Sequence, residues 1–139
     1  MSDPSRIVRA GDERLIVSPK TLIVDDEPDL LDTCVRLLRQ VGHTCLTAAD
    51  AREAIALIDA ERPNLVVTDF RLPTLDGLAI TRHARRCSPP MPVIVTTAYT
   101  SPDAKRGAQQ AGATIFLPKP FSATEFLDAV RRALASPLT

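Results

Sequence analysis

The sequence has little that would support a metal-thiolate or disulfide scaffold. It contains three cysteines, no tryptophan and one tyrosine. Cys34, Cys45 and Cys87 form no CxxC pair, and the two histidines, His43 and His83, do not fall beside them. This spacing argues against a zinc site and against a disulfide framework, so we expect reduced thiols.

Long apolar segments are also missing. No hydrophobic run approaches the roughly 18 residues that a membrane-spanning helix needs. Residues 1–17 lack the long apolar core of a signal peptide. We therefore expect a cytoplasmic protein with no membrane partner.

Neither sign of charge is in excess. The 139 residues include 17 Lys and Arg and 17 Asp and Glu. A protein that binds nucleic acid by neutralising phosphates normally carries a basic excess, so we expect no nucleic-acid partner. The length suits about one domain, and a hydrophobic content of 45% is enough for one core.

What the sequence does contain is a regular alternation of strand and helix patterns. The expected strands cover 21–25, 44–48, 65–69, 93–97 and 114–118, and the expected helices cover 28–41, 50–61, 78–87, 101–112 and 122–135. Such alternation predicts right-handed crossovers and a parallel sheet with helices on both faces.

Residues 1–19 fall outside this alternation. Ile7–Val8 and Leu15–Val17 flank Gly11 and Asp12, so the segment could pair as a small hairpin. The other interpretation, which we prefer slightly, is a mobile arm.

Carboxylates stand at the ends of two expected strands. Asp25 and Asp26 end the first strand, and Asp69 ends the third. In a parallel sheet of this kind, ligands bind beyond the carboxyl ends of the strands. Three carboxylates in one pocket repel each other, and a hard cation such as Mg²⁺ relieves that repulsion. Helix capping is an equal alternative for either site alone, but the pair favours a cation site.

Two further side chains arrive at the same edge. Thr97 ends the fourth strand and Lys119 follows the fifth. An ammonium beside carboxylates and a metal suits phosphoryl transfer, where charge on the transferred group must be neutralised. Each residue alone has an ordinary interpretation, as a strand threonine and a solvated loop lysine.

The stretches LIVDDEPDL, LVVTDFRLPTLDGL, MPVIVTTAY and AGATIFLPKPF resemble the signature segments of bacterial response-regulator receiver domains. The resemblance covers about residues 20–135. It implies an α/β, flavodoxin-like fold, a doubly wound parallel sheet of five βα units with strand order 2-1-3-4-5. In that order the fifth strand lies at an edge, where Pro118 removes no interior hydrogen bond.

The resemblance also implies roles for the residues at the strand ends. Asp69 would be the phosphoacceptor. Asp25, Asp26, Asp69 and the backbone carbonyl of Arg71 would bind Mg²⁺. Lys119 would contact the phosphoryl group, and Thr97 would hydrogen-bond it after transfer.

Three further expectations follow from the same resemblance. Phe116 would be the aromatic switch residue, and the Lys119–Pro120 peptide bond would be cis. Arg71 and Tyr99 depart from the commonest family pattern at positions that flank the attacking water. We therefore predict an altered lifetime of the acyl phosphate, and the direction stays open.

The function implied is two-component signalling. A histidine kinase or a phosphotransfer protein would donate the phosphoryl group from a phosphohistidine. The surface of helix four, strand five and helix five would then contact an unknown downstream protein. We expect a receiver domain over 20–136, no output domain, no enzymatic activity beyond self-phosphorylation and self-dephosphorylation, and a second copy of the chain as a further candidate partner.

Other interpretations remain to be weighed. The receiver could be excised from a larger regulator or a hybrid kinase, or be a degenerate domain that never takes phosphate. A haloacid-dehalogenase-type phosphatase would need a D-x-D pair after the first strand, whereas Asp25 and Asp26 are adjacent. A flavodoxin-like electron carrier would need a phosphate-binding loop where this chain has the acidic DDEPDLLDT.

Overall fold

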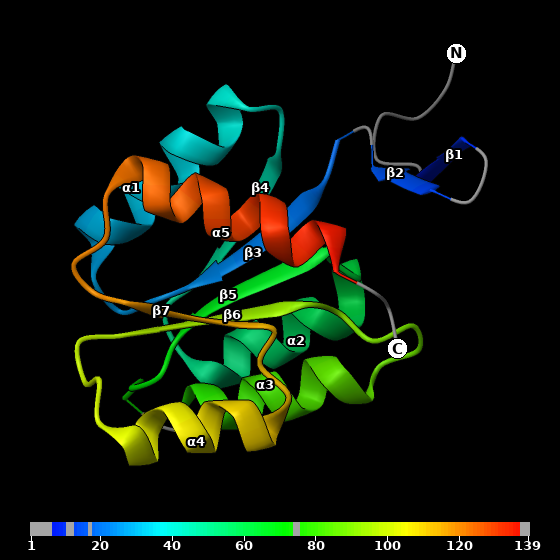
Figure 1. Ribbon diagram of the computed structural model, residues 1–139. Helices are drawn as coiled ribbons and strands as arrows, with labels where there is room; N and C mark the ends of the chain where they lie inside the picture. The colour runs from blue at the N-terminus through cyan, green and yellow to red at the C-terminus, as the bar shows by residue number, and fades with distance from the viewer. Residues whose placement is uncertain (1–6, 11–12, 17, 74–75, 137–139) are drawn as a thin grey trace.

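One parallel sheet of five strands organises the chain (Figure 1). The computed structural model describes residues 7–10, 13–16, 18–73 and 76–136. The strands are β3 (Lys20–Val24), β4 (Thr44–Ala48), β5 (Leu65–Asp69), β6 (Val93–Thr97) and β7 (Ile115–Pro118). Their spatial order is β4-β3-β5-β6-β7, which is the predicted order 2-1-3-4-5.

Five helices cover the two faces of this sheet. They are α1 (Pro28–Gln40), α2 (Ala51–Glu61), α3 (Gly77–Arg86), α4 (Pro102–Ala111) and α5 (Ala123–Ala135). Helices α1 and α5 lie on one face, and α2, α3 and α4 lie on the other (Figure 1). The fold is therefore the doubly wound α/β arrangement that the alternating pattern predicts.

The central strands are buried on both faces. Side chains of β3, β5 and β6 alternate between two apolar clusters, one under each helical layer. Leu22 and Val66 belong to the cluster under α2, α3 and α4, whereas Ile23 and Val67 belong to the cluster under α1 and α5. Double-sided burial explains why these strands are uniformly apolar in the sequence.

Strand β7 lies at the edge of the sheet, as the position of Pro118 predicts. It pairs only with β6 among the described strands, with Pro118 opposite Thr97. Because the outer side of β7 has no strand partner, the missing N–H of Pro118 leaves no interior hydrogen bond unmade.

The helix ends follow the capping residues that the sequence shows. The Asp50 side chain accepts a hydrogen bond from the Glu53 N–H at the start of α2. Ser122 and Glu125 form a reciprocal capping box at the start of α5. Gly112 ends α4 with a φ of +102°, a conformation that glycine adopts without steric cost. Other predicted boundaries differ by one or two residues.

The N-terminal segment contains a two-stranded antiparallel sheet. Strand β1 (Ile7–Ala10) pairs with β2 (Glu13–Ile16), and Ile7 lies opposite Ile16. This is the hairpin alternative rather than the arm that we preferred. The expected turn residues, Gly11 and Asp12, lie outside the described residues. Extended segments rich in apolar residues on both sides of a Gly-Asp pair favour such pairing.

No helix within the described residues is long and apolar enough to cross a membrane. The three cysteines are free thiols, as expected. Burial raises the pKa of the Cys34 thiol to about 11, with a smaller contribution from the charge of Asp25. A thiol in that environment stays protonated at neutral pH.

His43 gives the fold a specific pH dependence. Burial lowers the pKa of its imidazole below the ordinary value of 6.5, and Nδ1 lies 2.8 Å from Oγ1 of Thr21. A lowered pKa in the folded state contributes stability above pH 6.5, which is lost as the pH falls through the lowered value.

We therefore predict that the wild-type protein loses more stability than His43→Gln when the pH falls from about 7.5 to about 5. Urea denaturation at both pH values measures the difference. Equal losses in the two proteins would contradict this role for His43.

Candidate functional site

The parallel sheet brings two of the predicted aspartates to neighbouring strand ends. In the β3–β5 pairing Val24 lies opposite Thr68, so Asp25 and Asp69 leave the sheet side by side. The Asp25 N–H donates to the carbonyl of Ala48, which extends β3 by one bond. Backbone pairing alone thus brings together side chains that are far apart in the sequence.

Asp25, Asp26 and Asp69 form one carboxylate cluster. An oxygen from each lies within 4.8 Å of an oxygen from the others. Oδ1 of Asp25 accepts a hydrogen bond from the Glu27 N–H at 2.9 Å. Oδ1 of Asp69 accepts one from the Arg71 N–H at 3.3 Å. These bonds hold one oxygen of each carboxylate and leave the other for a cation.

Lys119 is the cation that the structure places there. Its Nζ donates to Oδ2 of Asp25 at 2.9 Å and to Oδ2 of Asp69 at 3.2 Å. All three side chains are largely buried, with 14% of the Lys119 side chain exposed, 4% of Asp25 and 13% of Asp69. A shielded ammonium between two carboxylates interacts more strongly than a surface ion pair.

The pKa values report how these charges balance. Burial raises the pKa of Asp69, and the charge of Asp25 raises it further, while Lys119 and the Arg71 N–H oppose the rise. Burial would lower the pKa of Lys119, but its hydrogen bonds and charge interactions with Asp25 and Asp69 outweigh burial and raise it. Lys119 therefore stays an ammonium, and Asp69 carries its negative charge at a cost.

Thr97 lies fully buried at the end of β6. Its Oγ1 accepts a hydrogen bond from the Tyr99 N–H at 2.9 Å, and its carbonyl accepts one from the Lys119 N–H at 2.8 Å. The second bond joins the end of β6 to the residue that reaches the carboxylates. Phe116, opposite Val95 in the β6–β7 pairing, is half-buried and packs against the core under α2, α3 and α4.

Arg71 and Tyr99 contact each other beside this site. The guanidinium carbon of Arg71 lies 4.0 Å from the centroid of the Tyr99 ring. Each residue is also tied to the site through its backbone, since the Arg71 N–H binds Asp69 and the Tyr99 N–H binds Thr97. The sequence singled out both residues but did not show that they stack.

The sequence interpretation missed the structural role of Gly77, which it treated as part of a loop before the third helix. Gly77 is the first residue of α3, and its N–H donates to the carbonyl of Phe70 at 2.8 Å. A Cβ atom at position 77 would collide with the backbone oxygen of Asp69. Glycine is therefore required for the close approach of α3 to the phosphoacceptor candidate.

The donor set at this edge suits magnesium. Asp25, Asp26 and Asp69 offer only oxygen ligands, and Asp26 is exposed, which leaves room for the waters that Mg²⁺ retains. The single positive charge of Lys119 balances only part of the negative charge of the three carboxylates. The role of the Arg71 carbonyl remains a prediction. The Lys119–Pro120 peptide bond is cis.

A second group of metal-ligating side chains corrects one expectation. His83 does lie beside a cysteine: Asp59, His83 and Cys87 each offer a ligand atom within 4.8 Å of the others. The two residues are four apart in the sequence, and the helical turn at the end of α3 brings His83 and its C-cap residue Cys87 together. Their i, i+4 spacing was the signal available in the sequence.

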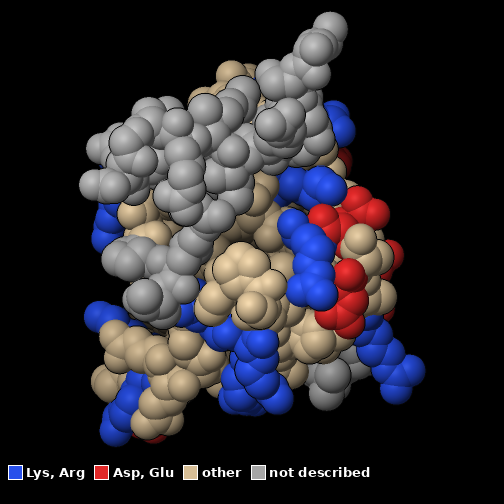
Figure 2. Space-filling view, turned by 90° about the vertical axis from the view of Figure 1, so that its right-hand side faces the viewer, with Lys and Arg blue, Asp and Glu red and all other residues tan. Residues whose placement is uncertain are grey.

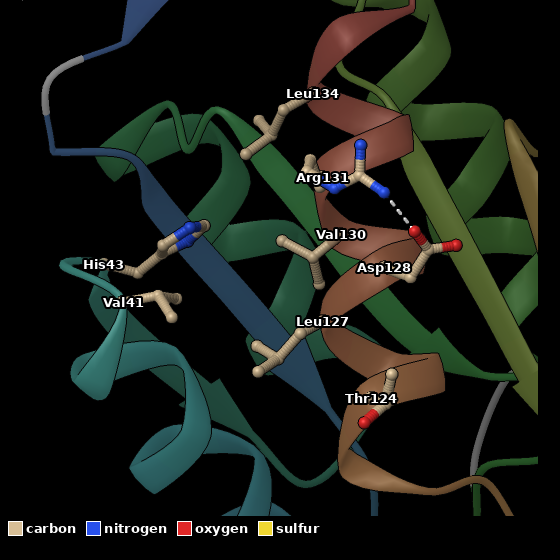
Figure 3. Close-up of a pocket in the computed structure, with 8 residues that line it drawn as sticks. All are labelled: Val41, His43, Thr124, Leu127, Asp128, Val130, Arg131 and Leu134. Carbon is tan, nitrogen blue, oxygen red and sulfur yellow. Dashed lines mark hydrogen bonds and ion pairs between the residues drawn. The ribbon is translucent and has the colours of Figure 1, made fainter.

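A separate apolar hollow of about 580 Å³ lies between α5 and the turn that follows α1 (Figure 3). Leu127, Val130 and Leu134 from α5 line one side, and Val41 and His43 line the other. Its charged residues, Asp128 and Arg131, pair with each other. The hollow therefore offers no set of converging polar groups, and we assign no chemistry to it.

Comparison with known proteins gives a consistent result. A family model described as "Response regulator receiver domain" matches residues 21–131. The chain is 35% identical over 113 residues to the DNA-binding transcriptional regulator NtrC of Salmonella typhimurium, which covers 81% of this chain and 24% of that protein. It is 37% identical over 115 residues to the response regulator MprA of Mycolicibacterium vanbaalenii, which covers 83% of this chain and 50% of that protein.

Solved structures agree with the sequence matches. The crystal structure of a CheY-like response regulator receiver domain protein from Methanospirillum hungatei superposes with a TM-score of 0.80 at 31% identity. The match covers 84% of this chain and 94% of that chain. By contrast, the chain spans between about a quarter and a half of the length of the two curated relatives named above.

The burial of Asp69 generates a stability prediction. Because burial and the charge of Asp25 both disfavour the Asp69 carboxylate, Asp69→Asn should be more stable than wild type at neutral pH in magnesium-free buffer. The gain should shrink as the pH falls through the raised pKa of Asp69 and should be absent below about 4, where the carboxyl is protonated in both the folded and the unfolded wild-type chain. Thermal unfolding at the two pH values measures this, with the exposed Asp103→Asn as control. A loss of stability in Asp69→Asn at neutral pH would contradict it.

Proposed function

Because this chain belongs to the response-regulator receiver family of two-component systems, we propose that Asp69 is the residue on which it accepts a phosphoryl group. Phosphorylation is the family's known role, and receiver domains are in general signalling modules rather than enzymes. The observation that carries the assignment is the position of Asp69 at a strand end, within hydrogen-bond distance of Lys119 and beside Asp25 and Asp26.

The chemistry is a nucleophilic displacement at phosphorus. A carboxylate oxygen of Asp69 attacks the phosphorus of a phosphohistidine, the new O–P bond forms, and the N–P bond breaks. The imidazole, protonated on its other ring nitrogen, leaves with the electron pair of the N–P bond and is then the neutral histidine of the donor protein. Lys119 stays beside the equatorial oxygens of the transferred group, where its charge is favourable in the transition state.

Receiver domains bind Mg²⁺ at an acidic pocket, and in this chain Asp25, Asp26, Asp69 and the backbone carbonyl of Arg71 are the residues that would hold it. The ion would supply positive charge next to the phosphoryl oxygens. With positive charge supplied by the ion, Lys119 would no longer have to compensate the charge of Asp25 and could turn its Nζ toward the phosphoryl group. The ion would then balance the carboxylates while Lys119 contacts the phosphoryl group, which accounts for a site with both an ammonium and an excess of carboxylate.

We further propose that Thr97 and Phe116 carry the signal away from Asp69. The Oγ1 of Thr97, which accepts a hydrogen bond from the Tyr99 N–H, would donate one to the phosphoryl group. Movement of Thr97 changes the packing at the end of β6, and half-buried Phe116 on neighbouring β7 can then turn inward. The surface of α4, β7 and α5 would present the change to a downstream protein.

The receiver family interacts with histidine kinases and with downstream effectors. For this chain we propose a histidine kinase or a phosphotransfer protein as donor, in the cytoplasm, and residues 20–136 as the receiver unit. We also propose that its only reactions are self-phosphorylation and self-dephosphorylation. NtrC is named a DNA-binding transcriptional regulator, and a receiver excised from a larger regulator is consistent with the short coverage of such relatives.

The assignment predicts one covalent phosphoryl group per chain. Incubated with a small-molecule phosphodonor and Mg²⁺, the wild-type protein should gain the mass of one phosphoryl group in intact-mass spectrometry. Asp69→Asn should gain none, and Lys119→Ala should gain it far more slowly, because the charge near the phosphoryl oxygens is lost. Asp76→Asn is the matched control, since Asp76 caps α3 outside the cluster. Equal labelling of wild type and Asp69→Asn would overturn the proposal.

The contact between Arg71 and Tyr99 gives a direction to the predicted change in the lifetime of the acyl phosphate. A stacked pair beside the site hinders an attacking water, and an exposed cation–π contact is worth roughly 0.5–1 kcal/mol. Arg71→Ala should therefore shorten the lifetime of the acyl phosphate by about two- to fivefold. Loss of radiolabel from the purified phosphoprotein measures it, with the exposed Arg82→Ala as control. Identical decay in Arg71→Ala and wild type would remove the idea.

A further inference from the structure

We propose that Asp59, His83 and Cys87 form a second metal site, which binds Zn²⁺ and is separate from the acidic pocket at Asp69. The three side chains come from two helices that pack against each other, Asp59 from the last turn of α2 and His83 with Cys87 from the end of α3. One ligand atom from each lies within 4.8 Å of the other two.

The three ligand atoms lie close enough together to reach one ion. An Asp59 oxygen and Nε2 of His83 are 2.7 Å apart across the two helices, and Sγ of Cys87 lies 3.5 Å from the carbonyl of His83 in the same helical turn. Zinc binds nitrogen at about 2.0–2.1 Å and thiolate sulfur at about 2.3 Å. Ligand atoms already this close can converge on one ion by small side-chain rotations.

The chemical types of the three ligands favour zinc over magnesium and calcium. An imidazole, a thiolate and a carboxylate suit zinc, whereas Mg²⁺ and Ca²⁺ prefer oxygen ligands alone. The acidic pocket has the opposite character, because Asp25, Asp26 and Asp69 offer only oxygen. The two sites should therefore divide the metals between them, magnesium at the carboxylates and zinc at the mixed cluster.

The C-terminal ends of two helices favour a divalent cation at the cluster. Both α2 and α3 end near it, so the negative ends of two helix dipoles lie on the ligand side. Figure 2 shows both basic side chains, in blue, and acidic side chains, in red, at this end of the molecule, and α3 carries Arg85 and Arg86 in its last turn. An Asp carboxylate and a Cys thiolate together neutralise Zn²⁺, so the bound site adds no positive charge beside these arginines.

The cluster is accessible from solvent, and it lies far from the phosphorylation chemistry. The Asp59 side chain is 58% exposed and that of His83 is 33% exposed, which leaves a fourth position for water. Helix α2 ends beside the first residue of β3, since Lys20 pairs with Glu61, and Asp25 follows the opposite end of the same strand. Zinc would thus join the ends of α2 and α3 at the edge of the sheet remote from Asp69.

The test is a metal titration of tag-free protein in excess Mg²⁺, which occupies the acidic pocket. Wild type should bind one Zn²⁺ per chain in competition with a chromophoric chelator and should release a proton as Cys87 ionises. His83→Ala and Cys87→Ser should each weaken binding by at least about tenfold, the loss typical of even a second-shell change. Cys45→Ser is the matched control, because Cys45 is likewise a half-buried free thiol, and it should bind zinc as wild type does.

Cobalt supplies a readout that stability changes cannot imitate. Co²⁺ in the site should give a thiolate charge-transfer band and tetrahedral d–d bands in wild type, in Cys45→Ser and in Asp69→Asn. Cys87→Ser should lose the charge-transfer band while circular dichroism shows an intact fold. Absence of zinc binding in wild type, or an unchanged cobalt spectrum in Cys87→Ser, would overturn the site. Retention of the site in Asp69→Asn keeps this test independent of the phosphorylation proposal.

Discussion

The ammonium of Lys119 between Asp25 and Asp69 is the interaction on which the site depends. Two largely buried carboxylates that face each other would be unfavourable without a cation between them. Lys119 supplies that cation from the loop after β7, on the opposite side of β5 and β6 from Asp25. The apo site is therefore stable enough to fold and still short of positive charge, which is the condition for binding Mg²⁺ and then a phosphoryl group.

The order of the strands connects the site at Asp69 with the proposed output surface. Strand β5 lies at the centre of the sheet and β7 at its edge, so Phe116 in β7 and Lys119 directly after it lie on the side of the proposed output face. The Lys119 N–H also donates a hydrogen bond to the carbonyl of Thr97, so a displacement of either residue affects the same edge of the sheet. The core under α1 and α5 and the core under α2, α3 and α4 hold this frame in place.

Much of this arrangement could be predicted because the signals are local. Uniformly apolar strands, Asp50 and Ser122 as caps and Gly112 as a helix end fix the elements, and carboxylates at strand ends indicate the site. Contacts between distant segments could not be read in this way. The collision that excludes a side chain at Gly77 depends on how α3 approaches Asp69. The stacking of Arg71 on Tyr99 depends on two loops meeting.

The most direct test of the central claim is to locate the phosphoryl group itself. Borohydride reduction of the phosphorylated protein converts an aspartyl phosphate to homoserine, which tandem mass spectrometry of peptides assigns to a position. We expect homoserine at position 69 alone, and only when Mg²⁺ was present during phosphorylation. Homoserine at position 25, 26 or 76 in place of 69, or labelling that is equally efficient without the metal, would contradict it.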